Sequence, residues 1–324
     1  IIEDLDNAFF PTKMIVPSTE IVHDRANLEV FRGCIRGCRF CQAGFSCRPV
    51  RKKSPEVLYR QAVEMLEDSG NNEITISSLS TSDYRGLKEL TDQMIPYCEQ
   101  NRVNLSVPSL RADNFSRELM EKLQTVRKSG LTFAPEAGTQ RLRDVINKNL
   151  TEEEILSTCT IAFAGGWNNV KLYFMIGLPY EDYPDIKGIS DLADKVVECF
   201  YKSEKTNKRR PPSVTLSVAS FVPKPFTPFQ WEPQDTQEIV KAKQQHMRDK
   251  FKAIKGANFN YHESDLSYLE ACFARGDRRM GKVLLRAFEK GCILDGWGEL
   301  FKYDAWREAF EETGIDPAFY AFRR

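Results

Sequence analysis

The sequence predicts an α/β protein: an open six-stranded parallel β/α barrel (a partial TIM barrel) with a C-terminal helical extension. Two observations favour this class. Short apolar segments alternate with amphipathic helical segments from residue 28 to residue 221, and the region after residue 236 is mostly helical. Such alternation is typical of parallel sheets. We expect the barrel over residues 1–235 and the helical extension over residues 236–324.

Each expected element has a local signal. Ser54 and Pro55 are typical first residues of a helix, and Thr151 with Glu154 forms a capping-box pattern for a helix to about residue 164. Further helices are expected at 87–102, 116–128 and 185–204. The expected strands are 28–31, 73–77, 104–107, 131–134, 169–176 (the clearest buried strand) and 213–221, and a short extended stretch at 258–262 interrupts the extension.

The segment GCIRGCRFCQAG places Cys34, Cys38 and Cys41 on one short loop with two glycines. Cysteine thiolates ligate iron–sulfur clusters, so three of them can hold three irons of a four-iron four-sulfur (4Fe-4S) cluster. No fourth cysteine follows at a matching spacing, and the fourth iron would be open to a small molecule. Zinc usually takes four ligands in paired blocks, and the three histidines of the chain form no such block. A disulfide framework is the other alternative, but nothing marks the chain as secreted.

This spacing, with the aromatic Phe40 before the last cysteine, resembles that of the radical S-adenosylmethionine (SAM) enzymes. The nearest likeness is to a bacterial branch of B12 (cobalamin)-binding-domain/radical-SAM proteins of poorly defined function, of which this chain would be the radical domain only. The further segments that carry the resemblance are SLSTSDY, PSLRAD, FAPEAGTQRLRDVINK, FMIGLPYED and FVPKPFTPFQWEP.

The resemblance implies an enzyme in which SAM binds the open iron and is cleaved reductively to methionine and a 5′-deoxyadenosyl radical. We expect a transferase that methylates or methylthiolates RNA or a ribosomal protein, served by an electron donor such as flavodoxin or ferredoxin. The alternative is a non-catalytic iron–sulfur redox or assembly protein. Cobalamin would be a cofactor only if a further N-terminal domain exists, because about thirty residues precede Cys34, too few for a domain.

Polar residues that follow the second and third strands are candidate SAM contacts, since barrel sites lie at strand ends. The resemblance places Ser80 and Asp83 near the amino group of SAM, although a helix-capping loop explains these residues equally well. Ser109 and Arg111 follow the third strand. An arginine can bind a carboxylate with two hydrogen bonds, and a solvated surface arginine is the alternative.

The later strand ends supply further candidates. The resemblance places Glu136 near the ribose of SAM and Arg141 near its carboxylate. Because ionised groups are rarely buried without a partner, Arg141 is alternatively the structural partner of Glu136. Ile176 and Gly177 resemble the adenine-stacking motif, where glycine lets the backbone approach the ring. Pro223, after the sixth strand, is expected against adenine or substrate.

Composition fits a soluble globular enzyme of the cytoplasm. Lys and Arg together number 46, as do Asp and Glu, so no global field attracts nucleic acid or an anionic membrane. We expect no membrane span, because no run of 18 or more apolar residues exists. Nine cysteines with a cluster motif favour a reducing compartment.

Two basic clusters and the remaining cysteines complete the candidates. Each basic cluster is either solvated loop charge or a phosphate contact for RNA. The first comprises Arg48, Arg51, Lys52 and Lys53, and the second Lys205, Lys208, Arg209 and Arg210. Cys47 is expected to be a free loop thiol or a thiol that acts on a substrate radical. The others are expected to be small buried hydrophobes: Cys98, Cys159, Cys199, Cys272 and Cys292.

Overall fold

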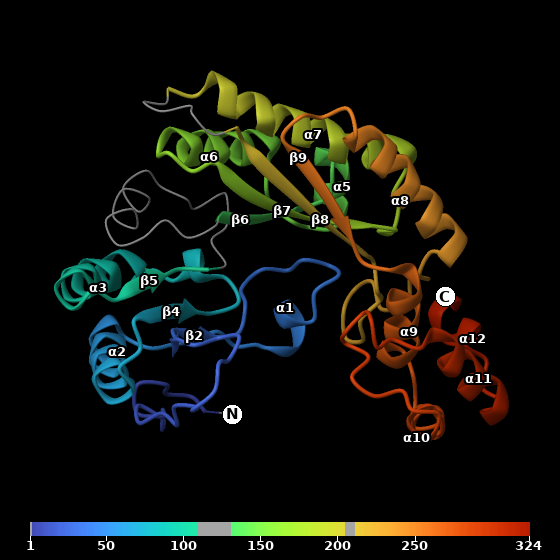
Figure 1. The fold of residues 1–324 in the computed structure, drawn as a ribbon, viewed down its shortest axis with the longest axis horizontal. Coiled ribbons are helices and arrows are strands. Elements are labelled where there is room, and N and C mark those ends of the chain that lie inside the picture. The colour runs from blue at the N-terminus through green and yellow to red at the C-terminus, as the bar shows by residue number, and fades with distance from the viewer. Residues whose placement is uncertain (1, 109–130, 205–210) are drawn as a thin grey trace.

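The computed structural model describes residues 2–108, 131–204 and 211–324. Within these residues are two sheets that are each built of parallel strands (Figure 1). The first sheet has the order β1-β4-β5, and the second has the order β6-β7-β8-β9. The strands of the first sheet are β1 (Ala26–Glu29), β4 (Glu73–Ser77) and β5 (Asn104–Ser106). Those of the second are β6 (Leu131–Glu136), β7 (Asn169–Ile176), β8 (Ser213–Ser220) and β9 (Ala257–Tyr261).

An α/β fold with parallel sheets is therefore confirmed, and all six expected strands are present. No backbone pairing joins β5 to β6 within the described residues, so one continuous six-stranded barrel stays a prediction. The stretch expected at 258–262 is β9, which pairs in parallel with β8 from Val214 to Val218. The sequence pattern did not predict this pairing. The crossover to β9 is made by α8 (Gln237–Phe251).

Helices cover one face of each sheet. In the first sheet these are α2 (Pro55–Ser69) and α3 (Leu87–Asn101), and in the second they are α6 (Glu152–Ala164), α7 (Tyr183–Lys202) and α8 (Figure 1). Alternate strand residues such as Leu172 and Leu216 are fully buried against these helices. Each such side chain contributes about 1.5–3 kcal/mol of hydrophobic stabilisation. The other face of each sheet is turned toward the space between the sheets.

Local signals predicted the helix starts. The Ser54 hydroxyl accepts a hydrogen bond from the amide of Val57 at 3.4 Å, and Thr151 and Glu154 form the expected capping box. The cysteine loop lies between the strands of a short antiparallel hairpin, β2 (Phe31–Arg32) and β3 (Arg51–Lys52). Two short helices flank the site: α1 (Ala43–Ser46) after the cysteines and α5 (Gln140–Val145) after β6.

The C-terminal helices have a hydrophobic cluster of their own, which includes Cys272, Val283, Trp306 and Phe310. They are α9 (Ser264–Ala274), α10 (Met280–Glu289), α11 (Tyr303–Thr313) and α12 (Pro317–Phe322). None of the helices in the described ranges combines the length and the apolar character that crossing a bilayer requires.

Candidate functional site

The cysteine loop is fixed by close backbone approaches at two glycines. Gly33 has a φ of +96°, and a Cβ there would lie 2.3 Å from the carbonyl oxygen of Cys47. A Cβ on Gly37 would lie 3.1 Å from Nδ2 of Asn147, which donates a hydrogen bond to the Gly37 carbonyl at 2.8 Å. Gly33 thus lets the loop turn sharply against residues 47–50, and Gly37 lets it pack against Asn147.

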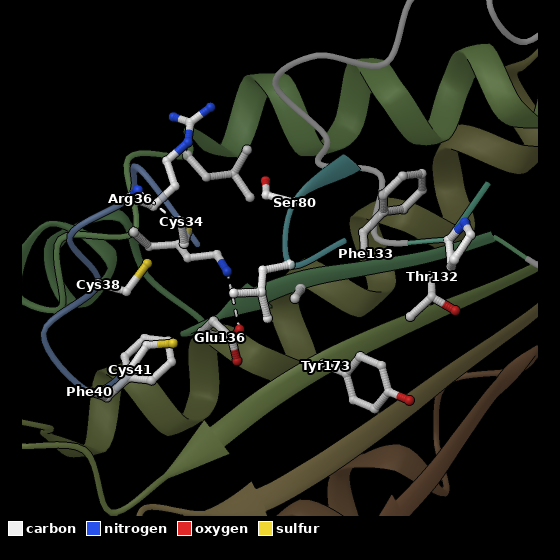
Figure 2. Close-up of a pocket in the computed structure, with 15 residues that line it drawn as sticks. Cys34, Arg36, Cys38, Phe40, Cys41, Ser80, Thr132, Phe133, Glu136 and Tyr173 are labelled. Atoms are coloured by element: carbon white, nitrogen blue, oxygen red, sulfur yellow. Dashed lines mark hydrogen bonds and ion pairs between the residues drawn. The ribbon is translucent and has the colours of Figure 1, made fainter. Parts of the chain in front are cut away.

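Cys34, Cys38 and Cys41 all line one cavity of about 460 Å³ (Figure 2). Cys34 and Cys38 are buried, Cys41 is partly exposed, and all three thiols are free. The cavity lies between the two sheets, since its walls include Ser80 and Pro108 beyond the first sheet and strand residues of the second. Its other lining residues are Arg36, Phe40, Leu79, Thr132, Phe133, Ala134, Glu136, Lys148, Leu150 and Tyr173.

The donor set fits an iron–sulfur cluster better than a single metal ion. In a cluster each thiolate binds a different iron, so the sulfurs surround the group instead of converging on one point. Within the described residues, no three Cys, His, Asp or Glu side chains converge closely enough to hold one ion. The amide of Arg36 also donates toward Sγ of Cys34 at 3.4 Å, and such a donor stabilises a thiolate.

Glu136 points into the cavity because of an irregularity in β6. The register of β6 against β7 shifts between Phe133 and Glu136, and Glu136 has a φ of +69°. Bulges often re-aim side chains next to active sites, and a positive φ at a non-glycine residue is a strained conformation that clusters at functional sites. The carboxylate meets Lys148, whose Nζ lies 3.1 Å from Oε1 of Glu136.

Arg143 brings the two members of this pair together. Its fully buried guanidinium donates to the carbonyl of Ala137 at 2.9 Å and to the carbonyl of Leu150 at 3.0 Å. The Glu136 turn and the segment that carries Lys148 are thereby tied to one side chain. Burial lowers the pKa of Arg143, but an arginine stays charged in proteins.

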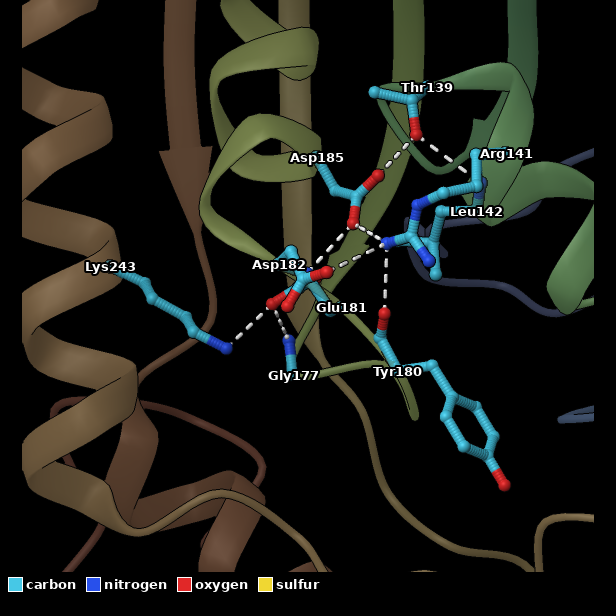
Figure 3. Close-up of polar contacts among 9 residues, drawn as sticks. All are labelled: Thr139, Arg141, Leu142, Gly177, Tyr180, Glu181, Asp182, Asp185 and Lys243. Atoms are coloured by element: carbon cyan, nitrogen blue, oxygen red, sulfur yellow. Dashed lines mark hydrogen bonds and ion pairs between the residues drawn. The ribbon is translucent and has the colours of Figure 1, made fainter.

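Arg141 is not the partner of Glu136, so the structural alternative proposed from the sequence is wrong. Its guanidinium pairs with Asp185 and donates to the Tyr180 carbonyl at 2.9 Å (Figure 3). It does not line the cavity. The side chain turns toward the N-terminus of α7, where the nearly buried Asp185 carboxylate attracts it. Asp185 also accepts hydrogen bonds from Thr139 and from the amide of Asp182.

Ser80 and Asp83 lie together beside the cysteine loop. The Ser80 hydroxyl donates to Asp83 at 2.8 Å, and Nε of Arg36 donates to the same carboxylate at 2.9 Å. Ser80 lines the main cavity. Asp83 lines a neighbouring cavity of about 200 Å³ that also includes Cys34 and Ser80. The two residues are therefore adjacent to the cysteines, but Asp83 is engaged by protein groups.

Ile176, Gly177 and Pro223 are buried near the ends of β7 and β8 and do not line the main cavity. Gly177 has a φ of +76°, and its amide donates to Oε1 of Glu181 at 2.8 Å (Figure 3). The Lys243 ammonium, from α8, lies 2.6 Å from this same oxygen. Burial raises the pKa of Glu181, while Lys243 and the Gly177 amide oppose that rise. The turn after β7 is thus held by a buried ion pair.

Other candidates lie elsewhere. Ser109 and Arg111, the helix expected at 116–128, and the second basic cluster, from Lys205 to Arg210, fall outside the described residues. Lys53 does not belong to a basic surface cluster, so the prediction for the first cluster is wrong at this residue. Its side chain is only 2% exposed, and its ammonium group donates a hydrogen bond to Gln61 at 2.8 Å. Cys47 is exposed, and the other five cysteines are buried or partly buried, as expected.

Two residues of the cavity, Lys148 and Tyr173, were not among the candidates predicted from the sequence. Lys148 ends the segment FAPEAGTQRLRDVINK, twelve residues beyond Glu136, but nothing in that pattern distinguished it from the other basic residues there. The signal for Tyr173 was present: Lys171 and Tyr173 alternate with apolar residues in NVKLYFMI. We predicted a buried strand there, but only one face of β7 is buried and Tyr173 is 40% exposed.

Comparisons with known proteins match one family and several relatives. The family model of the Radical SAM superfamily matches residues 28–193. An uncharacterized protein of Methanocaldococcus jannaschii is 31% identical over 290 residues, covering 89% of this chain and 60% of that protein. A putative methylthiotransferase of the same organism is 26% identical over 171 residues, 49% of this chain and 36% of that protein. The chain thus spans three-fifths or less of each relative.

Structural comparison agrees at the level of the fold. The crystal structure of SuiB from Streptococcus suis superposes with a TM-score of 0.50 at 13% sequence identity. The match covers 76% of this chain and 51% of that chain. At this identity the likeness is one of fold alone.

Proposed function

The chain belongs to the radical SAM superfamily, and we propose that it cleaves SAM reductively at a 4Fe-4S cluster held by Cys34, Cys38 and Cys41. The family implies both the cluster and SAM. The observation that carries the proposal is the shared cavity: the three cysteines line the same space as the paired Glu136 and Lys148. When bound, such a cluster supplies the electron that splits SAM into methionine and a 5′-deoxyadenosyl radical.

The roles of this chain's residues follow from charge and position. Lys148 and Arg36 are the cations among the described residues that line the cavity. Because Nε and Nη2 of Arg36 pair with Asp83, we assign Lys148, and not Arg141, to the carboxylate of SAM. Glu136 accepts hydrogen bonds from the ribose hydroxyls or the amino group. Phe40 supplies an apolar wall beside Cys41. The turn at Ile176 and Gly177 supports the adenine end.

The finer reaction is a methyl or methylthio transfer, with RNA or a ribosomal protein as substrate. Support for this choice is the 26% identity with a putative methylthiotransferase. We also propose that the two sheets are parts of one open six-stranded barrel, and that flavodoxin or ferredoxin delivers the electron near the partly exposed Cys41. Cobalamin would require a domain beyond this chain.

Anaerobic incubation tests the central proposal. Reconstituted protein, reduced with dithionite and given SAM, should form 5′-deoxyadenosine and methionine in equal amounts. The Cys34→Ala/Cys38→Ala/Cys41→Ala variant should form neither, and Cys47→Ala, on the same loop, should behave like the parent. Protein that keeps four irons and binds SAM yet forms no 5′-deoxyadenosine would favour the non-catalytic iron–sulfur alternative.

A further inference from the structure

The face of the second sheet that looks toward the first sheet departs from the rule for parallel sheets. Parallel strands are normally buried on both faces and read as continuous apolar runs, and barrel interiors are normally filled with branched apolar side chains. Here the strands alternate: apolar residues face the helices, and the other face carries mostly polar residues, with Met175 and Ala219 as a third, apolar row near the strand ends. Such a face offers hydrogen-bonding groups to a polar ligand.

We name this surface the inner face and define it by seven residues in two rows across the strands. Strand register places Thr132, Lys171, Thr215 and Asn258 side by side in the first row. The second row holds Tyr173, Ser217 and Asn260. Thr132, Tyr173 and both asparagines are exposed, and the others are half-buried. Neighbouring strands lie about 4.8 Å apart, so hydrogen-bonding groups recur at that spacing.

The inner face begins at the candidate SAM site and extends away from it. Thr132 and Tyr173 line the cavity that contains the cysteines (Figure 2). The polar residues of β8 and β9 continue the same rows beyond that cavity. An occupant can therefore place one unit beside the reacting atoms while its remainder continues along the sheet, as a polymer does.

The chemistry of the inner face fits a nucleic-acid strand. Nζ of Lys171 lies 4.8 Å from the ring centroid of Tyr173, which pairs a cation with an aromatic surface. None of the seven residues is acidic, and the nearby Glu136 already faces Lys148. Bases stack on aromatic side chains, lysines neutralise phosphates, and hydroxyl and amide groups can bond to the 2′-hydroxyl of RNA. Peptides instead bind along strand edges or in apolar grooves, whereas these two rows are polar side chains on the face of the sheet.

We propose that the inner face binds single-stranded RNA, with a base stacked on Tyr173 and a phosphate paired with Lys171. The proposal rests on the radical SAM activity proposed above and names the substrate class of the same site. The nucleotide on Tyr173 is the one presented to the cavity, and the strand runs on toward Asn258 and Asn260.

Fluorescence anisotropy with a labelled 12-nucleotide single-stranded RNA pool tests this under anaerobic conditions. Tyr173→Leu should weaken binding about tenfold, the cost of losing one base stack. The slope of the logarithm of the association constant against the logarithm of the salt concentration reports the number of phosphate contacts. Lys171→Gln should reduce the magnitude of this slope by about one, the value for one lost contact. Matched controls on the helix-covered side of the sheet are Tyr201→Leu and Lys202→Gln, both exposed on α7. They should bind RNA like the parent, and thermal melts should show all four variants folded.

Competition in the same assay tests other possible ligands of the inner face. The unlabelled RNA pool should displace the probe, whereas a single-stranded DNA pool of the same length, free mononucleotides and unfolded casein should do so at least tenfold less well. Equal displacement by any of these, or unchanged binding in folded Tyr173→Leu and Lys171→Gln, would overturn the RNA assignment. The parent's 5′-deoxyadenosine yield without RNA is measured in the same preparation. If the parent binds RNA but forms no 5′-deoxyadenosine, the proposed function is contradicted. If it forms 5′-deoxyadenosine but does not bind RNA, this inference is contradicted.

Discussion

The Nζ atom of Lys148 lies 3.1 Å from Oε1 of Glu136, in the wall of the cavity that the three loop cysteines share. The two side chains are only 10% and 16% exposed. Desolvation offsets much of the attraction between two buried charges, so this pair adds little to stability by itself. It lies where our proposal places the charged groups of SAM.

Replacing Lys148 should weaken SAM binding while leaving the cluster in place. Lys148→Met removes a charged hydrogen-bond donor, a loss of about 1.5–3 kcal/mol, so the dissociation constant should rise at least tenfold. Equilibrium dialysis with SAM on iron-loaded protein measures it. Arg141→Gln is the matched control and should bind like the parent. If instead Arg141→Gln weakens SAM binding and Lys148→Met does not, then Arg141 binds the SAM carboxylate, as predicted from the sequence.

Iron content should depend on three cysteines and no others. Cys34→Ala, Cys38→Ala and Cys41→Ala should each lose the cluster, because each thiolate holds one iron. Cys47→Ala, exposed on the same loop, and Cys159→Ala, fully buried, should keep about four irons and four sulfides per chain. Iron and sulfide assays on anaerobically purified protein decide this. Unchanged iron in the triple alanine variant would refute the cluster site.

Lys53 should make stability rise with pH in the alkaline range. Burial lowers the pKa of its ammonium from 10.5 to about 8, so between these values the unfolded chain binds more protons than the folded one. The free energy of unfolding therefore increases as pH rises from 8 to 10.5. Lys53 contributes at most about 3 kcal/mol to this increase. Urea unfolding measures the free energy of unfolding of the parent and of Lys53→Met. The parent's value should rise relative to that of the variant as pH increases across this range. A pH-independent difference would contradict the lowered pKa.

Lys243 should protect the turn after β7 in a pH-dependent way. Lys243→Met leaves the nearly buried Glu181 without its cation, and breaking a buried pair costs roughly 3–5 kcal/mol. Burial then raises the pKa of Glu181 further, so the folded variant binds a proton that the unfolded chain releases, and its stability falls as pH rises. The stability gap to the parent should be larger at pH 8 than at pH 5.

The double variant Lys243→Met/Glu181→Gln provides the control for this effect. It has no buried carboxylate to titrate, so its gap to the parent should be smaller and flat between pH 5 and pH 8. Chemical unfolding at both pH values measures all three proteins. A gap for Lys243→Met that is equal at the two pH values would show that the ion pair does not control Glu181.

The strands, the helix caps and the cysteine loop could be predicted because their signals are local. The capping box at Thr151 and Glu154 depends on residues three apart, and the C-x3-C-x2-C spacing lies on one loop whose thiols need no distant partner to be recognised. Strand β9 was recognised as an extended stretch, but its pairing with β8 depends on how α8 packs, which its sequence does not state.

The amino-acid sequence by itself determined the alternation of strands and helices and the position of the three cysteines, because these depend on near neighbours in the chain. Only the tertiary structure decided which charges meet. Glu136 pairs with Lys148 and not Arg141 because a register shift in β6 and a positive φ aim its carboxylate inward, while Arg141 turns toward Asp185 at the start of α7. It also decided that Lys53 is buried and that the polar side of β7 faces the cavity, since burial is set by what packs against a residue and not by the residue's own type.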